Sequence, residues 1–125
     1  MMAIISFDQE NIYPHLDAAS AEELDQAEFG IVRLGSGGRI EYMNRYEATL
    51  AKLKQEDTMG KHFFTQVAPC TNNFLVAEKY KSEAGSRDET MDYIFTYRVK
   101  PTKVKLRLLT NPQNQYQYLL VKRRE

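Results

Sequence analysis

Three segments in the second half of the chain alternate between hydrophobic and polar residues, and this alternation constrains the fold most. They cover residues 90–100, 102–109 and 116–123. In the second segment valine and leucine side chains face one way, and lysine and arginine side chains face the other. Side chains on a strand point to alternate faces, so each segment is predicted to be a β-strand. The turn sequence NPQNQ between the last two favours antiparallel neighbours.

A β-hairpin is predicted earlier in the chain. The sequences FGIVRL (29–34) and RIEYMN (39–44) flank the glycine-rich GSGG, which supplies the positive φ angles of a tight turn. The glycines are not followed by Lys-Ser/Thr or by a helix, so a phosphate-binding loop is not predicted. With the three later strands, the hairpin predicts a five-stranded antiparallel sheet.

Helices are predicted in four places. Residues 9–27 are rich in Asp, Glu and Ala, and Ser20 with Glu23 can form a capping box, so one or two short helices are expected there. Residues 45–53 have helical spacing, and the residues expected on one face of that helix are Tyr46, Leu50 and Leu53. Residues 59–67 are expected to form a short strand or helix. Residues 72–84 are expected to form a longer helix that Asn72 or Asn73 begins and Gly85 ends.

The predicted fold class is therefore α+β: a five-stranded antiparallel sheet with helices mainly on one face and a short N-terminal helical cap. We expect residues 1–27 to form the cap and residues 28–125 to form one compact domain.

Composition narrows the possible functions and locations. Seventeen basic residues balance seventeen acidic ones, so net charge gives no reason to expect nucleic-acid or anionic-membrane binding. The basic sequence VKRRE (121–125) is interpreted as a solvated strand end. A single cysteine excludes a disulfide framework and favours a reducing compartment. The sequence contains no signal-peptide pattern and no apolar run of membrane-spanning length, so a cytoplasmic protein is expected, as a monomer or weak homodimer.

The single cysteine, Cys70, follows Pro69 in the sequence VAPCTNN. A lone cysteine is inert core filling, a reactive group or an attachment point. His15 and His62 are not spaced from other ligand residues as a metal site requires, so no metal is expected. A Cys70–His62 nucleophilic pair lacks an oxyanion loop, which argues against an enzyme.

The chain resembles the photoactive yellow proteins, which are small blue-light receptors with a PAS fold. The resemblance runs from about Phe29 to the end of the sequence. It is carried by the motifs GKHFFTQVAPCT (60–71), DYIFTY (92–97), KPTKVK (100–105) and VKR (121–123).

The resemblance implies a covalent cofactor. Cys70 would carry p-coumaric acid as a thioester, and Glu47 would be a buried, protonated acid that donates a hydrogen bond to the phenolate. Burial and a neighbouring anion both favour the protonated form of a carboxyl group. Further residues that the resemblance places around the chromophore are Tyr42, Met43, Tyr46, Ala51, Leu53, Phe63, Val67, Ala68, Pro69, Thr71, Phe95 and Val99.

The function implied is light sensing without substrate turnover. Light would isomerise the chromophore, Glu47 would give up its proton, and the cap would loosen to signal to an unknown partner. The alternative is a light-insensitive PAS sensory or protein-interaction domain with a free Cys70 or another ligand.

The site departs from the family pattern at three positions. Met43, Ala51 and Leu53 stand where the family has a tyrosine donor, a supporting threonine and an arginine. Tyr42 is one residue away and should point to the opposite face of its strand. Each missing hydrogen bond to a charged group costs roughly 1.5–3 kcal/mol, so the chromophore pKa is expected to rise.

Two further expectations follow from the resemblance. Tyr46, beside Glu47, is the candidate replacement donor. Val99 matches a methionine that speeds thermal recovery in the family, so slow dark recovery is expected.

Overall fold

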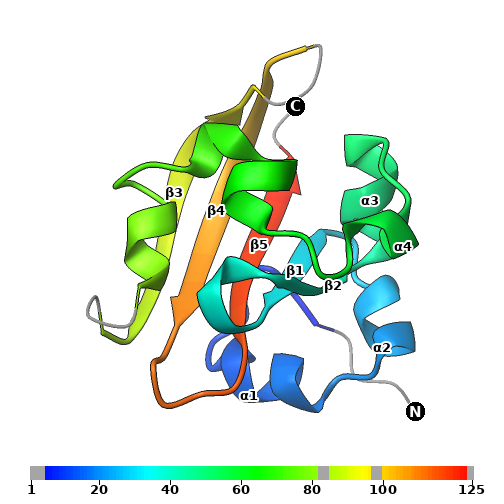
Figure 1. Ribbon diagram of the computed structural model, residues 1–125. Coiled ribbons are helices and arrows are strands. Elements are labelled where there is room, and N and C mark those ends of the chain that lie inside the picture. Colours follow the sequence, from blue (N-terminus) through cyan, green and yellow to red (C-terminus); the bar gives the residue numbers. More distant parts are fainter. Residues whose placement is uncertain (1–4, 82–84, 97–99, 124–125) are drawn as a thin grey trace.

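Five antiparallel strands form one sheet in the computed structural model, which describes residues 5–81, 85–96 and 100–123. The strands are β1 (Gly30–Leu34), β2 (Ile40–Met43), β3 (Arg87–Phe95), β4 (Thr102–Thr110) and β5 (Gln117–Arg123). Their order across the sheet is β2-β1-β5-β4-β3, so the last strand in the chain lies at the centre (Figure 1). The predicted α+β class and five-stranded antiparallel sheet are confirmed.

The helices are short. The α-helices are α1 (Ile12–Ala18), α2 (Ala21–Asp25), α3 (Arg45–Ala51) and α4 (Gln55–Thr58). The segment between α4 and β3 contains a π-helical turn, η2 (Phe63–Val67), and two 3₁₀ turns, η3 (Pro69–Thr71) and η4 (Ala77–Tyr80). A further 3₁₀ turn, η1 (Ser36–Gly38), connects β1 to β2. The expected capping box is present in α2, where the Ser20 and Glu23 side chains each bond the other's backbone N–H.

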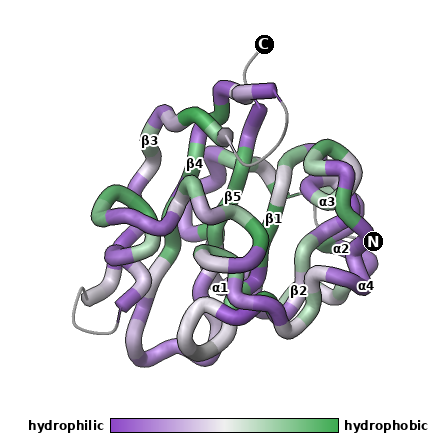
Figure 2. Tube along the Cα trace, turned by 45° about the horizontal axis from the view of Figure 1, so that its top comes forward, coloured by the Kyte–Doolittle hydropathy of each residue, from purple (hydrophilic) through white to green (hydrophobic). Residues whose placement is uncertain are grey.

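Hydrophobic side chains pack on both faces of the sheet. The strands and the helices around them are drawn in Figure 1, and the hydropathy of each residue is shown along the chain in Figure 2. We call the first face the helix face: Val32, Leu106 and Leu119 pack there with η2 and η4. We call the second the cap face: Ile31, Leu120 and the N-terminal segment with α1 and α2 pack there. The alternation along β1, β4 and β5 produces this division, because neighbouring residues on a strand point to opposite faces.

Two arginines on the cap face hold the N-terminal segment to the sheet. Arg33 of β1 donates from Nη2 to the carbonyl oxygens of Leu16 and Ala19, at 2.7 and 3.2 Å. Arg107 of β4 donates from Nη1 to the carbonyl oxygens of Phe7 and Gln9, at 2.7 and 2.8 Å. Charged donors thus satisfy backbone acceptors at the end of α1 and before it.

The predicted helix over 72–84 is wrong in its extent, because only η4 is helical among the residues described there. The Asn73 side chain accepts hydrogen bonds from the N–H groups of Leu75 and Val76, which folds the chain into a turn. Val76 then has φ −123° and ψ −71°, outside the helical region. Of the residues 59–67, where a short strand or helix was expected, Phe63–Val67 form the π-helical turn η2.

The expected face of α3 also needs correction. The buried residues of this helix are Glu47, Ala48 and Ala51, whereas Leu50 is 45% exposed. Helical spacing was right, but the face toward the sheet is the one with small side chains and an acid.

Candidate functional site

Cys70 lies in the short 3₁₀ turn η3, at the edge of the hydrophobic core on the helix face. Pro69 begins this turn, where a missing N–H costs nothing, and the Thr71 hydroxyl donates to the Ala68 carbonyl oxygen at 2.6 Å. Ala68 and Thr71 are fully buried, Pro69 is exposed, and Cys70 is half-buried. Its thiol therefore borders both the core and the surface.

The backbone of Cys70 is held by side chains from two other segments. The Tyr93 hydroxyl of β3 donates to the Cys70 carbonyl oxygen. Asn73 Nδ2 donates to the same oxygen at 3.2 Å and to the Tyr93 hydroxyl at 2.7 Å. In the sequence, Tyr93 belongs to the aromatic motif DYIFTY, and Asn73 was expected only as a possible start of a helix. The contacts of Tyr93 join residues 20 and 23 positions apart, so no local pattern reveals them.

Glu47 is buried in the first turn of α3, with 1% exposure. Asn44 caps the helix: its Oδ1 accepts from the N–H groups of Glu47 and Ile31, and its Nδ2 donates to the carbonyl oxygens of Leu24 and Phe29. This one amide fixes where α3 begins relative to β1 and α2.

Gly30 leaves the space that the Glu47 carboxyl group occupies. A Cβ atom at Gly30 would lie 2.3 Å from Glu47 Oε1, well inside contact distance. The missing side chain at the start of β1 therefore allows an acidic group to lie against the sheet backbone.

Glu47 forms a buried ion pair with Arg123 at the end of β5. Arg123 Nη1 lies 2.6 Å from Glu47 Oε1, and Nη2 lies 3.3 Å from Oε2. The Arg123 side chain is only 16% exposed, and its guanidinium carbon lies 5.9 Å from the Phe95 ring centroid. A guanidinium at this distance stabilises a carboxylate, and the expected neutral Glu47 beside a bound phenolate stays a prediction.

The interpretation of VKRRE as a solvated strand end is therefore wrong for Arg123. The signal that could have found it is the alternation of β5. Leu119 and Val121 lie in the core of the helix face, and Arg123 has the same strand parity. Lys122, one residue earlier, is exposed and lies over Phe7 on the cap face.

The positions where the family pattern is broken are apolar in the structure. Met43 and Ala51 are fully buried, and Leu53 packs against the same core. Tyr42 points to the other face, as the strand geometry predicts. A register shift in the hairpin lies between the Tyr42 and Ile40 pairings, yet it does not bring Tyr42 toward Glu47.

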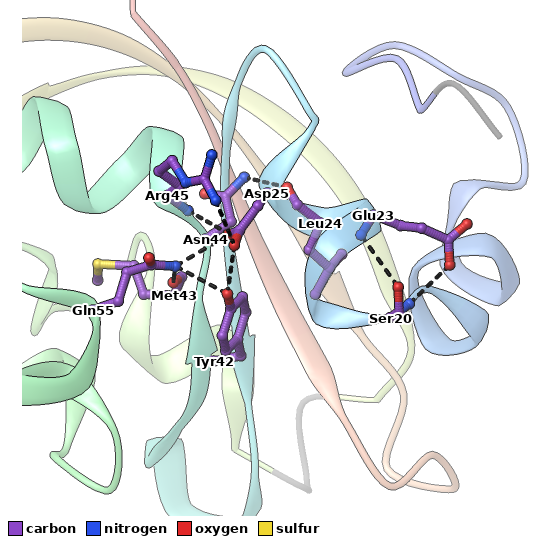
Figure 3. Close-up of polar contacts among 9 residues, drawn as sticks. All are labelled: Ser20, Glu23, Leu24, Asp25, Tyr42, Met43, Asn44, Arg45 and Gln55. Atoms are coloured by element: carbon purple, nitrogen blue, oxygen red, sulfur yellow. Dashed lines mark hydrogen bonds and ion pairs between the residues drawn. The ribbon is translucent and has the colours of Figure 1, made fainter. Parts of the chain in front are cut away.

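The Tyr42 hydroxyl instead belongs to a polar cluster around Asp25, at the end of α2 (Figure 3). It donates to Asp25 Oδ2 at 2.8 Å and accepts from Gln55 Nε2 at 3.0 Å. Asp25 Oδ1 also accepts from the Arg45 backbone N–H at 2.7 Å and from Gln55. Burial and the hydrogen bond to Asp25 raise the pKa of Tyr42.

The remaining predicted residues fall into three groups. Phe63 and Phe95 are buried in the core of the helix face, and Val67 packs against it. Tyr46 is half-buried on α3 beside Glu47. Val99 lies outside the described residues, so the expectation on dark recovery stays a prediction.

Several residues on the helix face are chemically suited to an acidic phenol linked through sulfur. Cys70 supplies a thiol at the edge of the core, and Met43, Phe63 and Phe95 supply apolar surface in that core. Glu47 and Arg123 supply an acid and a cation, which an oxygen anion inside a protein requires.

A cleft of about 870 Å³ lies toward the Leu34 end of β1, away from Gly30. His62, Phe64, Tyr80 and Gln117 are among its lining residues, and Cys70 and Glu47 are not. This cleft is distinct from the site proposed by the sequence.

The described part of the chain contains neither a cluster of metal-binding side chains nor a helix suited to cross a membrane. Its His, Cys, Asp and Glu side chains form no group of three or more that could hold a metal ion. None of its helices has the length and apolar character needed to cross a membrane.

Comparison with known proteins shows which proteins have a similar sequence and fold. No protein-family model matches the chain. It is 32% identical to the photoactive yellow protein of Rhodobacter capsulatus and 30% identical to that of Halochromatium salexigens, each over 98% of this chain and 99% of the relative. The photoactive yellow protein domain of the sensor histidine kinase Ppr from Rhodospirillum centenum superposes with a TM-score of 0.78 at 26% identity, covering 87% of this chain and 97% of that domain.

A more distant structure shares the fold alone. The PAS domain of the quorum-sensing receptor RpfR from Cronobacter turicensis, solved in complex with BDSF, has a TM-score of 0.57 at 16% identity and covers 80% of this chain and 97% of its own. The sheet and its covering helices thus define a PAS domain. Within that class, the chain belongs to the photoactive yellow protein family.

Proposed function

We propose that the protein is a blue-light photoreceptor with p-coumaric acid attached to Cys70 as a thioester. The observation that carries the proposal is the position of Cys70, a half-buried thiol on the same sheet face as the buried acid Glu47. When bound, the group supplies a double bond that light isomerises. In this proposal the protein undergoes a light-driven cycle, is located in the cytoplasm and does not turn over a substrate.

The chain's own residues have defined tasks in this proposal. Tyr93 and Asn73 hold the Cys70 carbonyl oxygen, so the thiol keeps a fixed direction relative to the core. Glu47 holds a proton at a carboxyl oxygen or releases it, depending on the charge beside it. A change of charge on Glu47 would weaken the packing around Asn44, which also binds the carbonyl oxygen of Leu24 in α2. The cap would loosen by this route and signal to a downstream protein.

Intact mass of protein treated with activated p-coumarate tests the attachment. We expect a mass gain of one coumaroyl group and a visible absorption band that bleaches under blue light. Cys70→Ala should lose both, and Thr71→Ser, next to the thiol, should keep both. Failure of the wild-type protein to gain the adduct would overturn the proposal.

A second function is favoured by one observation. Met43 and Ala51 place buried apolar side chains where the family has hydroxyl donors. A light-insensitive PAS sensory domain with a free Cys70 would need no such donors. An unmodified Cys70, or an adduct that does not bleach, would support this reading.

A further inference from the structure

The buried pair of Glu47 and Arg123 is a charged site inside an otherwise hydrophobic region. Its two oxygen–nitrogen contacts are 2.6 and 3.3 Å, and the two side chains are 1% and 16% exposed. Phe95 lies beneath the guanidinium and is 2% exposed. Because such pairs are costly to bury, the burial of this pair favours a functional role for it.

Three described residues where the family pattern would lead one to look for a hydrogen-bond donor supply none on the helix face. Met43 and Ala51 have no polar side-chain atom, and Tyr42 donates to Asp25 on the other side of the strand. Glu47 and Arg123 are two polar groups at this end of β1 and β5, and they bond each other. A guanidinium has five N–H donors in one plane, so it can hold a carboxyl group and a second oxygen together.

We propose that Arg123 is the positive partner of the chromophore's ring oxygen and replaces the hydroxyl donors lost at Met43 and Ala51. This inference rests on the proposed attachment at Cys70. Arg123 donates to the ring oxygen in its anionic form. Glu47, which shares the guanidinium, takes up one proton from solvent. The buried site then holds one cation and one anion, as the Glu47–Arg123 pair does now.

This assignment reverses the expectation drawn from the missing tyrosine. A cation within about 4–6 Å favours the charged form of an acid and lowers its pKa by about 1–3. The chromophore should therefore stay anionic at mildly acidic pH despite the apolar residues at 43 and 51.

The test is a pH titration of visible absorbance in protein reconstituted with activated p-coumarate. Arg123→Gln should raise the apparent pKa of the ring hydroxyl by about 1–3, with a neutral, shorter-wavelength form at neutral pH. Lys122→Gln is the matched control: it removes the same charge from the same strand but on the cap face, and should leave the pKa unchanged.

A structural role for Arg123 must be separated from contact with the ring oxygen. For this purpose the titration is repeated on Glu47→Gln and on the double variant Glu47→Gln/Arg123→Gln, which leaves no unpaired buried charge. We expect a higher apparent pKa in the double variant than in Glu47→Gln. Equal values would overturn the inference, because Arg123 would then act only through Glu47.

The outcomes distinguish the two proposals. Absence of a coumaroyl adduct on the wild-type protein would sink the proposed function. If the adduct forms but Arg123→Gln leaves the apparent pKa of the ring hydroxyl unchanged, only the role of Arg123 is contradicted. If Arg123→Gln does not fold, the double variant and Arg123→Lys decide, since Arg123→Lys keeps the charge and should keep the anionic form.

Discussion

At the scale of single residues, the site depends on close steric fit as well as on charge. Gly30 matters because the Glu47 carboxyl group occupies the place of its missing side chain. Gly30 lies inside the strand predicted over residues 29–34, where a glycine has no side chain to pack. The role of Gly30 depends on the packing of α3 against β1, and a contact between two elements cannot be predicted from a local pattern.

Gly30→Ala should therefore destabilise the protein by about 1–3 kcal/mol, the usual cost of overpacking. The added methyl group would push Glu47 away from Arg123. Urea unfolding measures the loss. Gly35→Ala is the control, because its Cβ would meet the exposed Glu41 side chain, which can move aside. Equal losses for the two variants would contradict this account of Gly30.

At the scale of elements, sequence predicted strands better than helices. The strands follow from a local pattern of alternating residues, and all five were found near their expected positions. The helix expected over 72–84 failed because the Asn73 side chain bonds the N–H groups of Leu75 and Val76 and makes a turn. Arg123 was missed because its basic neighbours suggested solvent, although the alternation of β5 pointed it inward.

Helix α1 gives the protein a measurable sensitivity to alkali through Tyr13. Burial is the main cause that raises the pKa of this phenol from its ordinary 10.0 to about 12. Its hydroxyl donates to the Tyr116 carbonyl oxygen beside β5. Because the folded protein binds this proton more tightly than the unfolded chain, the stabilisation is present below pH 10 and is lost as the pH rises toward about 12.

Tyr13→Phe should reduce the fall in stability between pH 10.0 and about 12, the window set by that pKa difference. The variant should also be less stable at pH 8, since it lacks the hydrogen bond to Tyr116. Urea midpoints at several pH values would check both effects. A fall in stability as steep as that of the wild type would show that other groups control alkaline unfolding. Tyr118 is the next residue to test, because burial and its hydrogen bond to Asp17 also raise its pKa.

At the scale of the whole molecule, the sheet separates two cores, and the cap is attached mainly through one of them. Arg107 spans the cap face: it pairs with Asp88 of β3 at 2.7 Å and binds two carbonyl oxygens of the N-terminal segment. We therefore expect that loosening of the cap would leave the core of the helix face closed, where Cys70 and Glu47 lie.

Arg107→Gln should speed amide hydrogen exchange in residues 5–18 by about tenfold or more, because two hydrogen bonds from a charged group are lost. Amides of β1 and η2 should change little. Lys103→Gln, an exposed charge on the same strand, is the control. Faster exchange throughout the protein would mean that the two cores open together.

The central position of β5 has a consequence for how the protein is made. A ribosome delivers this strand after the other four, and the hairpin of β1 and β2 cannot join that of β3 and β4 without it. Any β1–β2 or β3–β4 hairpin that forms before β5 is made therefore has an unpaired edge, and unpaired strand edges promote aggregation. Insertion of β5 closes both edges and brings Arg123 to Glu47 in the same event.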